Sequence, residues 1–390
     1  MHVSDQPITR ARLTPEHEKT VSATLPAVGE NIGTIAETFY HRMFSAHPEL
    51  LRDTFNRGNQ HSGAQQKALA ASVATFATML VDPEAPDPVT MLSRIAHKHV
   101  SVGIVEDQYP IVRRHLFDAI REVLGADTFT AEVEEAWDEV YWMMARVLID
   151  HESALYSSDG VAPGEVFREV TVTGIEKLSE TVSAFELSGE LSSPLPGQYT
   201  SVGVVLDDAA RQLRQYSIID GDAGRYRIAV ERDGEVSQYL QDHVAVGDTV
   251  QATLAAGDLT LDESTEAPVV LISSGIGSTP MVGILNHLAR TGSKRQVLVL
   301  HADSSRETHA QLGQTRAALE QLGHGELRTF YRDAGERIDV AEEVPGGADV
   351  YLCGGTGFLQ SLRADLAELP GEAAPVAVHF ELFSPNDWLA

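Results

Sequence analysis

The stretch Arg214-Gln215-Tyr216-Ser217 lies between two segments with strand-like patterns, Ser201–Leu206 and Tyr226–Val230. Side chains alternate between the two faces of an extended chain, which places the arginine and the tyrosine together and the serine opposite them. An arginine presents a planar, forked cation that suits a diphosphate. The stretch therefore predicts a strand that contacts a flavin, although similar strings also occur on ordinary edge strands.

The segments on either side of this stretch are short and are separated by turn residues. Five segments are predicted to be strands: Phe167–Gly174, Val182–Leu187, Gln198–Leu206, Leu213–Ile219 and Tyr226–Glu231. Several short strands in succession, with turn residues between them, are typical of all-β folds. This part of the chain therefore predicts a small antiparallel barrel or sandwich.

From about Pro268 onward, predicted strands alternate with predicted helices. The predicted strands are Val269–Ser273, Val297–His301, Asp349–Cys353 and Val376–Leu382. The predicted helices are Pro280–Arg290, Thr308–Leu322 and a third that begins at Gly357. Such alternation predicts an α/β domain with a parallel sheet.

The N-terminal part of the chain, from Thr14 to about Tyr156, has a helical pattern instead. Thr14 reads as an N-cap, with a proline in the first helical position after it. We predict about six or seven helices and no sheet, with breaks at His47-Pro48, Arg57-Gly58-Asn59, Asp82–Pro88 and Gly125-Ala126-Asp127. A linker-like composition follows at Ser157–Gly164. The predicted domains are therefore an all-α domain at 1–156, an antiparallel β-barrel at 157–264 and an α/β domain at 265–390.

Composition narrows the class of protein. The 390 residues carry a formal net charge of −28, from 57 acidic and 29 basic side chains. That charge argues against a nucleic-acid partner and against an anionic membrane surface. The single Cys353 excludes an internal disulfide framework and a four-cysteine iron–sulfur site. Because we find neither a signal peptide nor an apolar stretch of the roughly 18 residues that a membrane helix needs, we expect a cytoplasmic protein.

Four segments in the second half of the chain carry glycines or an aromatic residue where a nucleotide could bind. They are Gly234–Leu240, Ser274–Pro280, Cys353-Gly354-Gly355 and Glu381–Pro385. The first two open helices after a glycine, and the start of a helix favours phosphate. The second reads G-x-G-x-x-P and not the G-x-G-x-x-G dinucleotide fingerprint. Each segment alone is most simply a helix cap or a turn, so only the set points to a flavin and a nicotinamide nucleotide.

The helical half carries polar side chains on faces that are otherwise apolar. His99 follows Leu92, Ile95 and Ala96 at helical spacing, in a segment that is predicted to be a helix over 87–102. A lone buried histidine is most often a hydrogen-bonded core residue, so haem ligation starts as the minority interpretation. Tyr40 lies on the inward stripe of a helix predicted over 30–46, and Gln65 lies on that of a helix predicted to begin near Ser62. A tyrosine can also pack in a core, however, and a glutamine near a helix start can face water.

Residues 165–390 resemble the ferredoxin–NADP⁺ reductase superfamily, because the segments above occur in that family's order. The resemblance implies that FAD is held by Gln198, Tyr199, Arg214, Gln215, Tyr216, Ser217, Val236, Ser237 and Phe383. It implies that NADH or NADPH is held by Gly275, Ile276, Gly277, Ser278, Thr279, Pro280, Cys353, Gly354, Phe383 and Ser384.

The helical half resembles the globin domain of bacterial flavohaemoglobins. The stretches that carry this resemblance are Phe39–Phe44, Pro48-Glu49-Leu50, Phe55-Asn56, Asn59-Gln60, Ile95–His99, Gln108-Tyr109 and Ile149–Glu152. With the reductase part, the resemblance covers nearly the whole chain. It implies that haem b is the second prosthetic group of the chain.

The resemblance also implies a role for each residue of the haem pocket. His99 would be the proximal iron ligand, and Tyr109 with Glu152 would support it at the ring nitrogen far from the iron. Tyr40 and Gln65 would form the distal polar pair, with Leu69 as their apolar neighbour and Phe55 packed against the haem. Without the resemblance, Glu152 reads as a surface acid on the last helix.

The chain departs from the family pattern at a few places. Leu382-Phe383-Ser384-Pro385 stands where the family often has C-F-G-P, and Gly355 replaces a frequent proline. One residue is inserted between Leu50 and Phe55, and extra residues precede the first helix. The first departure keeps the aromatic side chain but puts the local turn in doubt. None of them removes a group that the chemistry needs.

The usual activity of the family is nitric oxide dioxygenase. The resemblance implies that NAD(P)H reduces FAD, that FAD reduces the haem, and that O₂ on ferrous haem oxidises nitric oxide to nitrate. The expected partners are small molecules, with no nucleic acid, no membrane span and no obligate protein partner. The alternatives are a flavin reductase for ferric iron or quinones, and an O₂ sensor or store. The nucleotide preference stays open, since Arg306 could pair with a 2′-phosphate while Asp303 would repel it.

Overall fold

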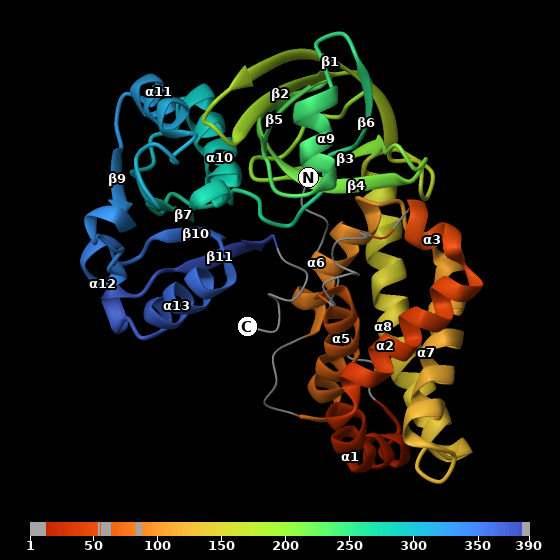
Figure 1. Cartoon of the computed structure of the whole chain (residues 1–390). Helices are drawn as coiled ribbons and strands as arrows, with labels where there is room; N and C mark the ends of the chain where they lie inside the picture. The colour runs from red at the N-terminus through yellow and green to blue at the C-terminus, as the bar shows by residue number, and fades with distance from the viewer. Residues whose placement is uncertain (1–12, 54, 56–63, 83–87, 384–390) are drawn as a thin grey trace. The chain divides into compact units, whose positions relative to one another are not determined.

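The structure is a computed structural model that describes residues 13–53, 55, 64–82 and 88–383, with the backbone alone at 64–71 and 88–91. The chain divides into two compact units (Figure 1). The helical unit comprises Met1–Val100 and Ile104–Pro163, and the reductase-like unit comprises Ser101–Gly103 and Gly164–Ala390. Each unit has its own hydrophobic clusters, so we describe each by itself.

The described residues of the helical unit form helices and turns, as the pattern predicts. The elements are α1 (Pro15–Glu30), α2 (Ile32–Ala46), α3 (Pro48–Asp53), α5 (Ala64–Val81), α6 (Pro88–Val100), the 3-10 turn η1 (Glu106–Gln108), α7 (Tyr109–Leu124) and α8 (Ala131–Ser158). Thr14 caps α1 by accepting a hydrogen bond from the backbone N–H of His17 at 3.2 Å. Gly125, with φ of 76°, ends α7 because a left-handed residue cannot continue the helix.

Helix boundaries differ from the sequence prediction at two places. The helix expected over 30–46 begins only at Ile32, because Asn31 separates it from α1. The helix expected over 87–102 ends at Val100, since a turn follows at Ser101–Gly103. The helix expected from near Ser62 is present from Ala64 onward, and its predicted start lies outside the described residues. The expected break at 57–59 lies outside the described residues.

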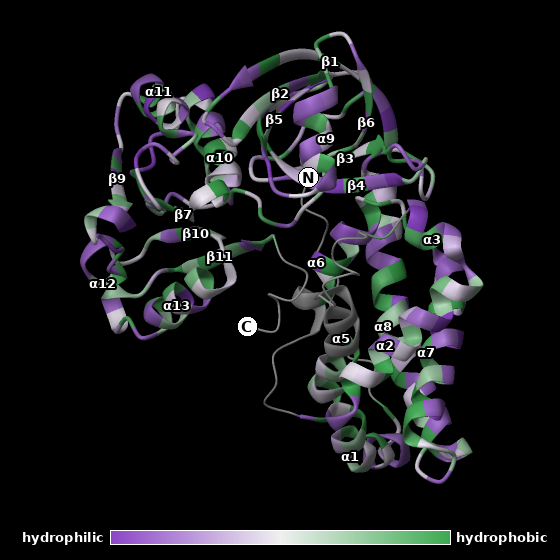
Figure 2. Ribbon diagram, in the orientation of Figure 1, coloured by the Kyte–Doolittle hydropathy of each residue, from purple (hydrophilic) through white to green (hydrophobic). Residues whose placement is uncertain are grey.

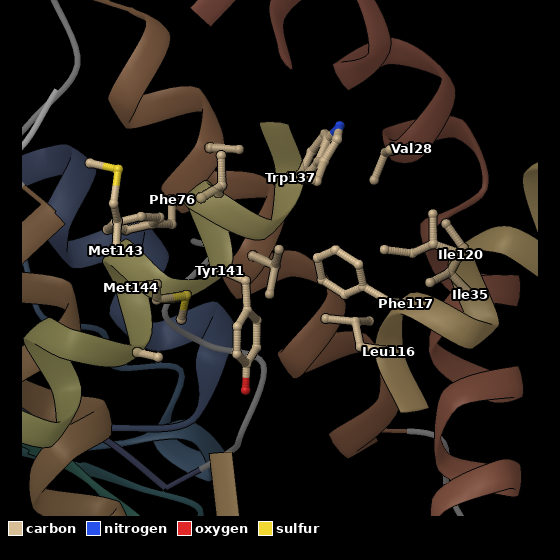
Figure 3. Close-up of a cluster of buried hydrophobic side chains, with 14 of the residues drawn as sticks. Val28, Ile35, Phe76, Leu116, Phe117, Ile120, Trp137, Tyr141, Met143 and Met144 are labelled. Carbon is tan, nitrogen blue, oxygen red and sulfur yellow. The ribbon is translucent and has the colours of Figure 1, made fainter. Parts of the chain in front are cut away.

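The core of the helical unit is a cluster of large apolar side chains (Figure 3). Trp137 of α8 lies in it at 2 % exposure, and its indole N–H donates to Thr24 Oγ1 at 2.9 Å. Ile35 of α2 and Phe117 of α7 reach the same cluster from two other helices. Burying one such side chain stabilises the fold by roughly 1.5–3 kcal/mol. This core therefore holds α2, α7 and α8 together.

The first half of the reductase-like unit is a closed antiparallel barrel, in the strand order β1-β2-β5-β4-β3-β6. Its strands are β1 (Phe167–Lys177), β2 (Val182–Ser188), β3 (Tyr199–Val205), β4 (Arg211–Asp222), β5 (Arg225–Glu231) and β6 (Thr249–Thr253). Helix α9 (Glu235–His243) lies against the barrel and contributes Val236 and Leu240 to its core (Figure 1). The sequence prediction of a barrel is confirmed, but it missed β6, a short strand with few apolar residues.

The second half of this unit is a parallel five-stranded sheet in the order β11-β10-β7-β8-β9. The strands are β7 (Val269–Ser274), β8 (Val297–Asp303), β9 (Glu326–Tyr331), β10 (Asp349–Gly354) and β11 (Ala377–Leu382). The other elements are the 3-10 turns η2 (Gly275–Gly277), η3 (Arg332–Ala334) and η4 (Gly371–Ala373), with the helices α10 (Ser278–Thr291), α11 (Leu312–Leu322), α12 (Val340–Glu343) and α13 (Thr356–Ala367). The sequence prediction of a parallel sheet is confirmed, but it missed β9 and placed the start of α11 at Thr308. β9 has only a weak hydrophobic pattern, because it is an edge strand with charged residues and no fully buried position.

Helices cover both faces of the sheet (Figure 1). Val269 and Leu271 of β7 share a buried cluster with α10 and α11. Val270 and Ile272 of the same strand share another with α12 and α13. Because alternate residues of one strand pack on opposite faces, the central strand reads as a continuous apolar run.

The barrel and the sheet pack directly on each other through β4 and α10. Gly283 of α10 comes so close to β4 that a Cβ atom there would lie 2.5 Å from the carbonyl oxygen of Ile218. Asn286, on the next turn of α10, donates from Nδ2 to the carbonyl oxygen of Ile219 at 2.7 Å. The strand that carries the flavin motif is therefore fixed against the helix that follows the nucleotide motif.

Hydrophobic and hydrophilic residues alternate along the helices of both units (Figure 2). This pattern is that of helices with one face on a protein core and the other exposed. Among the described residues, every helix is too short or too polar to cross a membrane.

Candidate functional site

His99 lies in the last turn of α6, on the face that packs into the helical unit. Ala96, one turn earlier, and Leu92, two turns earlier, are fully buried, so the stripe seen in the sequence is the inner face of this helix. The backbone N–H of Ile104 donates to the carbonyl oxygen of His99 at 3.0 Å, which closes the turn after α6. These contacts fix the position of the imidazole.

Two polar side chains from other helices meet the ring of His99 at Nδ1. Glu152 Oε1 of α8 lies 2.7 Å from Nδ1, and Tyr109 Oη, at the start of α7, lies 3.2 Å from it. Tyr109 also donates its hydroxyl to Glu152 Oε1 at 2.5 Å. Both contacts use Nδ1, so Nε2 is the nitrogen that can coordinate a metal. This arrangement fits a haem iron, since a histidine ligand usually donates its other N–H to a carboxylate.

The electrostatics of this trio follow from burial. Glu152 is only 3 % exposed, and Tyr109 is 7 % exposed. Burial raises the pKa of Tyr109 well above its ordinary value, and the charge of Glu152 adds to the effect. The phenol therefore stays protonated and donates to the carboxylate.

A spacing in α8 marks Glu152 as an inward-facing residue. Tyr141, Ala145, Leu148 and Glu152 follow one another at intervals of four, three and four residues, and all are buried. Tyr141 donates its hydroxyl to the carbonyl oxygen of Tyr109 at 2.7 Å. Tyr141 is therefore a supporting residue that the sequence reasoning missed, although the same helical stripe could have revealed it.

Tyr40 lies on the inner face of α2 among aromatic rings. It is 4 % exposed, and its ring centroid lies 5.4 Å from that of Phe44 and 6.0 Å from that of Phe55. Burial raises the pKa of Tyr40 well above its ordinary value, so it can only act as a neutral phenol. The backbones of Gln65 and Leu69 lie in α5, which packs against α2, but their side chains lie outside the described part of the chain.

The register of β3 and β4 brings several of the predicted flavin residues together. Tyr199 pairs with Ser217, and the next position pairs Thr200 with Tyr216. The hydroxyl oxygen of Tyr216 is buried and has no hydrogen-bond partner among the described residues. A buried phenol without a partner costs free energy, so this site fits a ligand that supplies polar groups, as FAD would.

Two predicted flavin residues use their side chains for hydrogen bonds within the protein. Gln198 accepts from the backbone N–H of Leu195 at 2.9 Å and donates to the carbonyl oxygen of Gly257 at 3.3 Å. Gln215 donates to Ser201 Oγ at 2.9 Å. Gln198 therefore holds the segment before β3, and Gln215 ties β4 to β3. A flavin could use only the hydrogen-bonding capacity that these bonds do not occupy.

Helix α9 begins at the glycine that the sequence singled out. Gly234 is the N-cap, and its backbone N–H donates to Ser237 Oγ at 2.9 Å. Val236 is fully buried in the barrel core, so only its backbone N–H can reach a ligand. Arg214 of β4 reaches this helix start, where Nη2 lies 3.4 Å from Glu235 Oε1. A guanidinium and a helix N-terminus thus converge, which suits a diphosphate.

The second glycine motif turns from β7 into α10. Gly275 has φ of 53°, and a Cβ atom there would meet nothing within 4 Å, so the backbone is open to close approach by a ligand. Gly277 is crowded instead, because a Cβ atom would lie 2.5 Å from the carbonyl oxygen of Cys353. Ser278 and Thr279 donate their hydroxyls to carbonyl oxygens of the same loop at 3.0 and 2.9 Å.

Two further predicted residues of this loop, Ile276 and Pro280, differ in exposure. Ile276 is half-buried, whereas Pro280 is buried in α10. The loop therefore offers a ligand the backbone near Gly275 and the side chain of Ile276, while the side chains from Ser278 to Pro280 hold the turn. This division suits a nucleotide pyrophosphate, which binds backbone N–H groups at the start of a helix.

Cys353 and Gly354 end β10 next to this loop. Cys353 is fully buried, and burial together with the nearby Glu381 raises the pKa of its thiol well above the ordinary value. The thiol therefore stays protonated. Phe383, just after β11, is 48 % exposed, and Ser384 lies outside the described residues.

Comparison with known proteins places the whole chain in one family. The globin family matches residues 37–148. The flavohaemoprotein of Halalkalibacterium halodurans is 37% identical over 416 residues, which cover 98% of this chain and 100% of that protein. The flavohaemoprotein of Deinococcus radiodurans is 38% identical over 405 residues, which cover 97% of this chain and 98% of that protein.

A solved structure agrees with these relatives. The flavohaemoglobin of Malassezia yamatoensis, determined with bound FAD and haem, matches with a TM-score of 0.88 at 31% identity. The match covers 95% of this chain and 100% of that structure. Relatives at this identity over nearly the full length establish that the chain belongs to the flavohaemoprotein family.

Proposed function

We propose that this chain is a nitric oxide dioxygenase that uses NADH or NADPH, FAD and haem. Its family and its reductase fold make it a haem–flavin oxidoreductase. The observation that carries the finer proposal is the contact of His99 with Tyr109 and Glu152, in a chain that also carries its own reductase. An O₂ carrier needs no reductase of its own, whereas a dioxygenase that turns over does.

On the proximal side, His99 would hold the haem iron through Nε2. Glu152 accepts a hydrogen bond from Nδ1–H and so gives the ring partial imidazolate character, which increases electron donation from His99. Tyr109 keeps the carboxylate in place through its 2.5 Å bond. When bound, haem supplies the iron at which O₂ and nitric oxide react to give nitrate, and FAD supplies single electrons from a nicotinamide hydride.

On the distal side, Tyr40 would donate a hydrogen bond to the oxygen substrate. Its raised pKa keeps the phenol protonated, and Phe44 and Phe55 surround it with apolar rings that exclude water. A hydrogen bond to a charged acceptor contributes roughly 1.5–3 kcal/mol. We assign Gln65 and Leu69 to this side by family resemblance.

In the reductase-like unit, each binding element offers a different group. Arg214 and the start of α9 would hold the FAD diphosphate, and Tyr216 and Ser217 would contact the rest of the flavin. The loop at Gly275 would hold the nicotinamide nucleotide. The tight packing of Gly283 on Ile218 keeps these two sites at a fixed separation, which hydride transfer requires.

The decisive experiment measures nitric oxide consumption by the full-length protein in air with NADH or NADPH. Nitrate formation from nitric oxide and O₂ takes one electron, so two nitrate ions are expected for each nicotinamide oxidised. His99→Ala is the matched control, because it removes the iron ligand and leaves the reductase unit unchanged. Nitric oxide consumption at the wild-type rate in His99→Ala would contradict the proposal.

The rival function is a flavin reductase for ferric iron or quinones. It predicts that NADH reduces the flavin but leaves the haem absorption band in its ferric position when O₂ is absent. The dioxygenase predicts that the haem band shifts within the turnover time. An O₂ sensor or store predicts in turn that nitric oxide causes no fast consumption of NADH in air.

A further inference from the structure

Arg214 faces a carboxylate at the place where a diphosphate is expected. Its Nη2 lies 3.4 Å from Oε1 of Glu235, the first residue of α9. The two side chains are 19 % and 35 % exposed, so the pair is partly accessible to solvent. Glu235 is therefore a negative charge within the region that Arg214 and α9 make attractive to anions.

A carboxylate and a diphosphate need the same two attractors. The positive end of the helix dipole lies at the start of α9, where an acid in the first turn is stabilised. The guanidinium of Arg214 adds the second attraction. Because the carboxylate of Glu235 already uses both, an incoming diphosphate has to displace it and then lie beside its charge.

The geometry of the pair suits exchange. A distance of 3.4 Å is longer than the roughly 2.7–2.9 Å of a strong charge-assisted hydrogen bond. The other terminal nitrogen, Nη1, donates to the carbonyl oxygen of Leu213 at 2.8 Å. That bond holds the guanidinium in place, so Nη2 can change from one anion to another without moving the side chain.

We propose that Glu235 competes with the diphosphate of FAD for Arg214, and that it thereby weakens FAD binding and speeds FAD release. This inference rests on the proposed assignment of Arg214 to the flavin. When FAD leaves, Glu235 neutralises Arg214 and supports the start of α9. The residue thus makes the flavin exchangeable while the barrel keeps its fold.

The test starts from the full-length protein from which the flavin has been removed. FAD is titrated into this protein, and binding is monitored through flavin fluorescence. Glu235→Gln keeps the length and the helix propensity of the side chain and removes its charge. We expect the Kd for FAD to fall about tenfold, or ~1.4 kcal/mol, with a slower dissociation rate. A Kd equal to that of the wild type would overturn the inference.

Asp242→Asn is the matched control. Asp242 lies on the same helix and forms an ion pair with Arg232 at 2.6 Å, and both partners are exposed. The substitution changes the net charge by the same amount, away from Arg214. We expect an unchanged Kd, and a gain equal to that of Glu235→Gln would mean that net charge alone acts, which overturns the inference.

Arg214→Gln separates this inference from the proposed flavin site. If that variant binds FAD as the wild type does, the assignment of Arg214 fails and the inference fails with it. If it binds FAD weakly while Glu235→Gln is unchanged, only the inference fails. In the double variant, most of the gain from Glu235→Gln should vanish, and a fully retained gain would show that Glu235 does not act through Arg214.

Discussion

Oε1 of Glu152 lies 2.7 Å from Nδ1 of His99, although 53 residues separate them in the chain. The contact joins the end of α6 to the last third of α8, which pack together in the helical unit. A buried carboxylate in this position controls how strongly the imidazole donates electrons. Several measurable properties should depend on it and on the residues around it.

Glu152→Gln should raise the reduction potential of the haem. A carboxylate stabilises the ferric state by making His99 a stronger donor, and an amide does this less. Substitution of such a supporting residue typically costs 10–100-fold in activity, so we expect nitric oxide turnover to fall by about that factor. A spectroelectrochemical titration gives the potential, and an unaltered potential with unaltered turnover would count against the role. Tyr109→Phe keeps the carboxylate and should have a smaller effect.

Tyr40→Phe should release O₂ faster than the wild type. The ring and its packing on Phe44 and Phe55 are kept, and only the hydroxyl is lost. If the phenol donates to the oxygen substrate, the loss of roughly 1.5–3 kcal/mol corresponds to about a 10- to 100-fold faster release. Flash photolysis measures this rate. An unchanged rate would exclude Tyr40 from that role.

Gly283→Ala should disturb the packing of the barrel on the sheet. The new Cβ atom would lie 2.5 Å from the carbonyl oxygen of Ile218, so α10 has to move away from β4. We expect a loss of roughly 1–3 kcal/mol in the free energy of unfolding and ~10- to 100-fold slower reduction of FAD by NADH. Thermal unfolding and stopped-flow absorption check the two effects. Gly313→Ala, in the open part of α11, is the control and should be neutral or slightly stabilising.

His309 should make the reductase-like unit less stable in mild acid. Burial, and then the neighbouring His301, lower the pKa of His309 from 6.5 to about 3. The folded unit therefore keeps this ring neutral, whereas the unfolded chain binds a proton below pH 6.5. Above pH 6.5, His309 does not lower the free energy of unfolding. As the pH drops towards 3, that free energy falls by up to about 1.4 kcal/mol per pH unit.

The effect of His309 is measured by denaturant unfolding, with the release of the flavin as the signal. Between pH 6.5 and pH 5 the wild type should lose roughly 2 kcal/mol through this group. His309→Gln should be less stable at neutral pH, because it loses the stacking on His301 at a centroid distance of 3.8 Å. The same variant should show a shallower pH dependence, and an equal slope in both proteins would refute the assignment.

Asp303→Asn should allow the protein to use NADPH better. Asp303 ends β8, and its side chain is 8 % exposed. Burial opposes its ionisation, but hydrogen bonds from His301, Thr308 and Ser304 outweigh that effect and lower its pKa. The carboxylate is therefore charged and suits a ribose hydroxyl better than a 2′-phosphate.

The asparagine keeps the shape of this side chain and removes the charge. We expect the ratio of kcat/KM for NADPH to that for NADH to rise about tenfold, or ~1.4 kcal/mol. Steady-state rates with both nucleotides give the ratio. Asp242→Asn, on the barrel helix α9, should leave it at the wild-type value, and an unchanged ratio in Asp303→Asn would assign nucleotide choice to other residues.

Local patterns in the sequence are enough to predict the three fold classes and most element positions. Alternating side chains predict β4, helical spacing places His99 on an inner face, and glycines indicate the starts of α9 and α10. The same patterns do not predict the edge strand β9, because it has no fully buried position and its hydrophobic signal is weak.

Which of these residues contact one another depends on the packing of distant elements. It brought Glu152 to His99, set Gly283 against Ile218, and placed Glu235 beside Arg214. A periodic pattern tells which face a residue occupies, but the partner across that face depends on how distant elements pack. That packing is set by the whole core, so a single segment of sequence does not contain it.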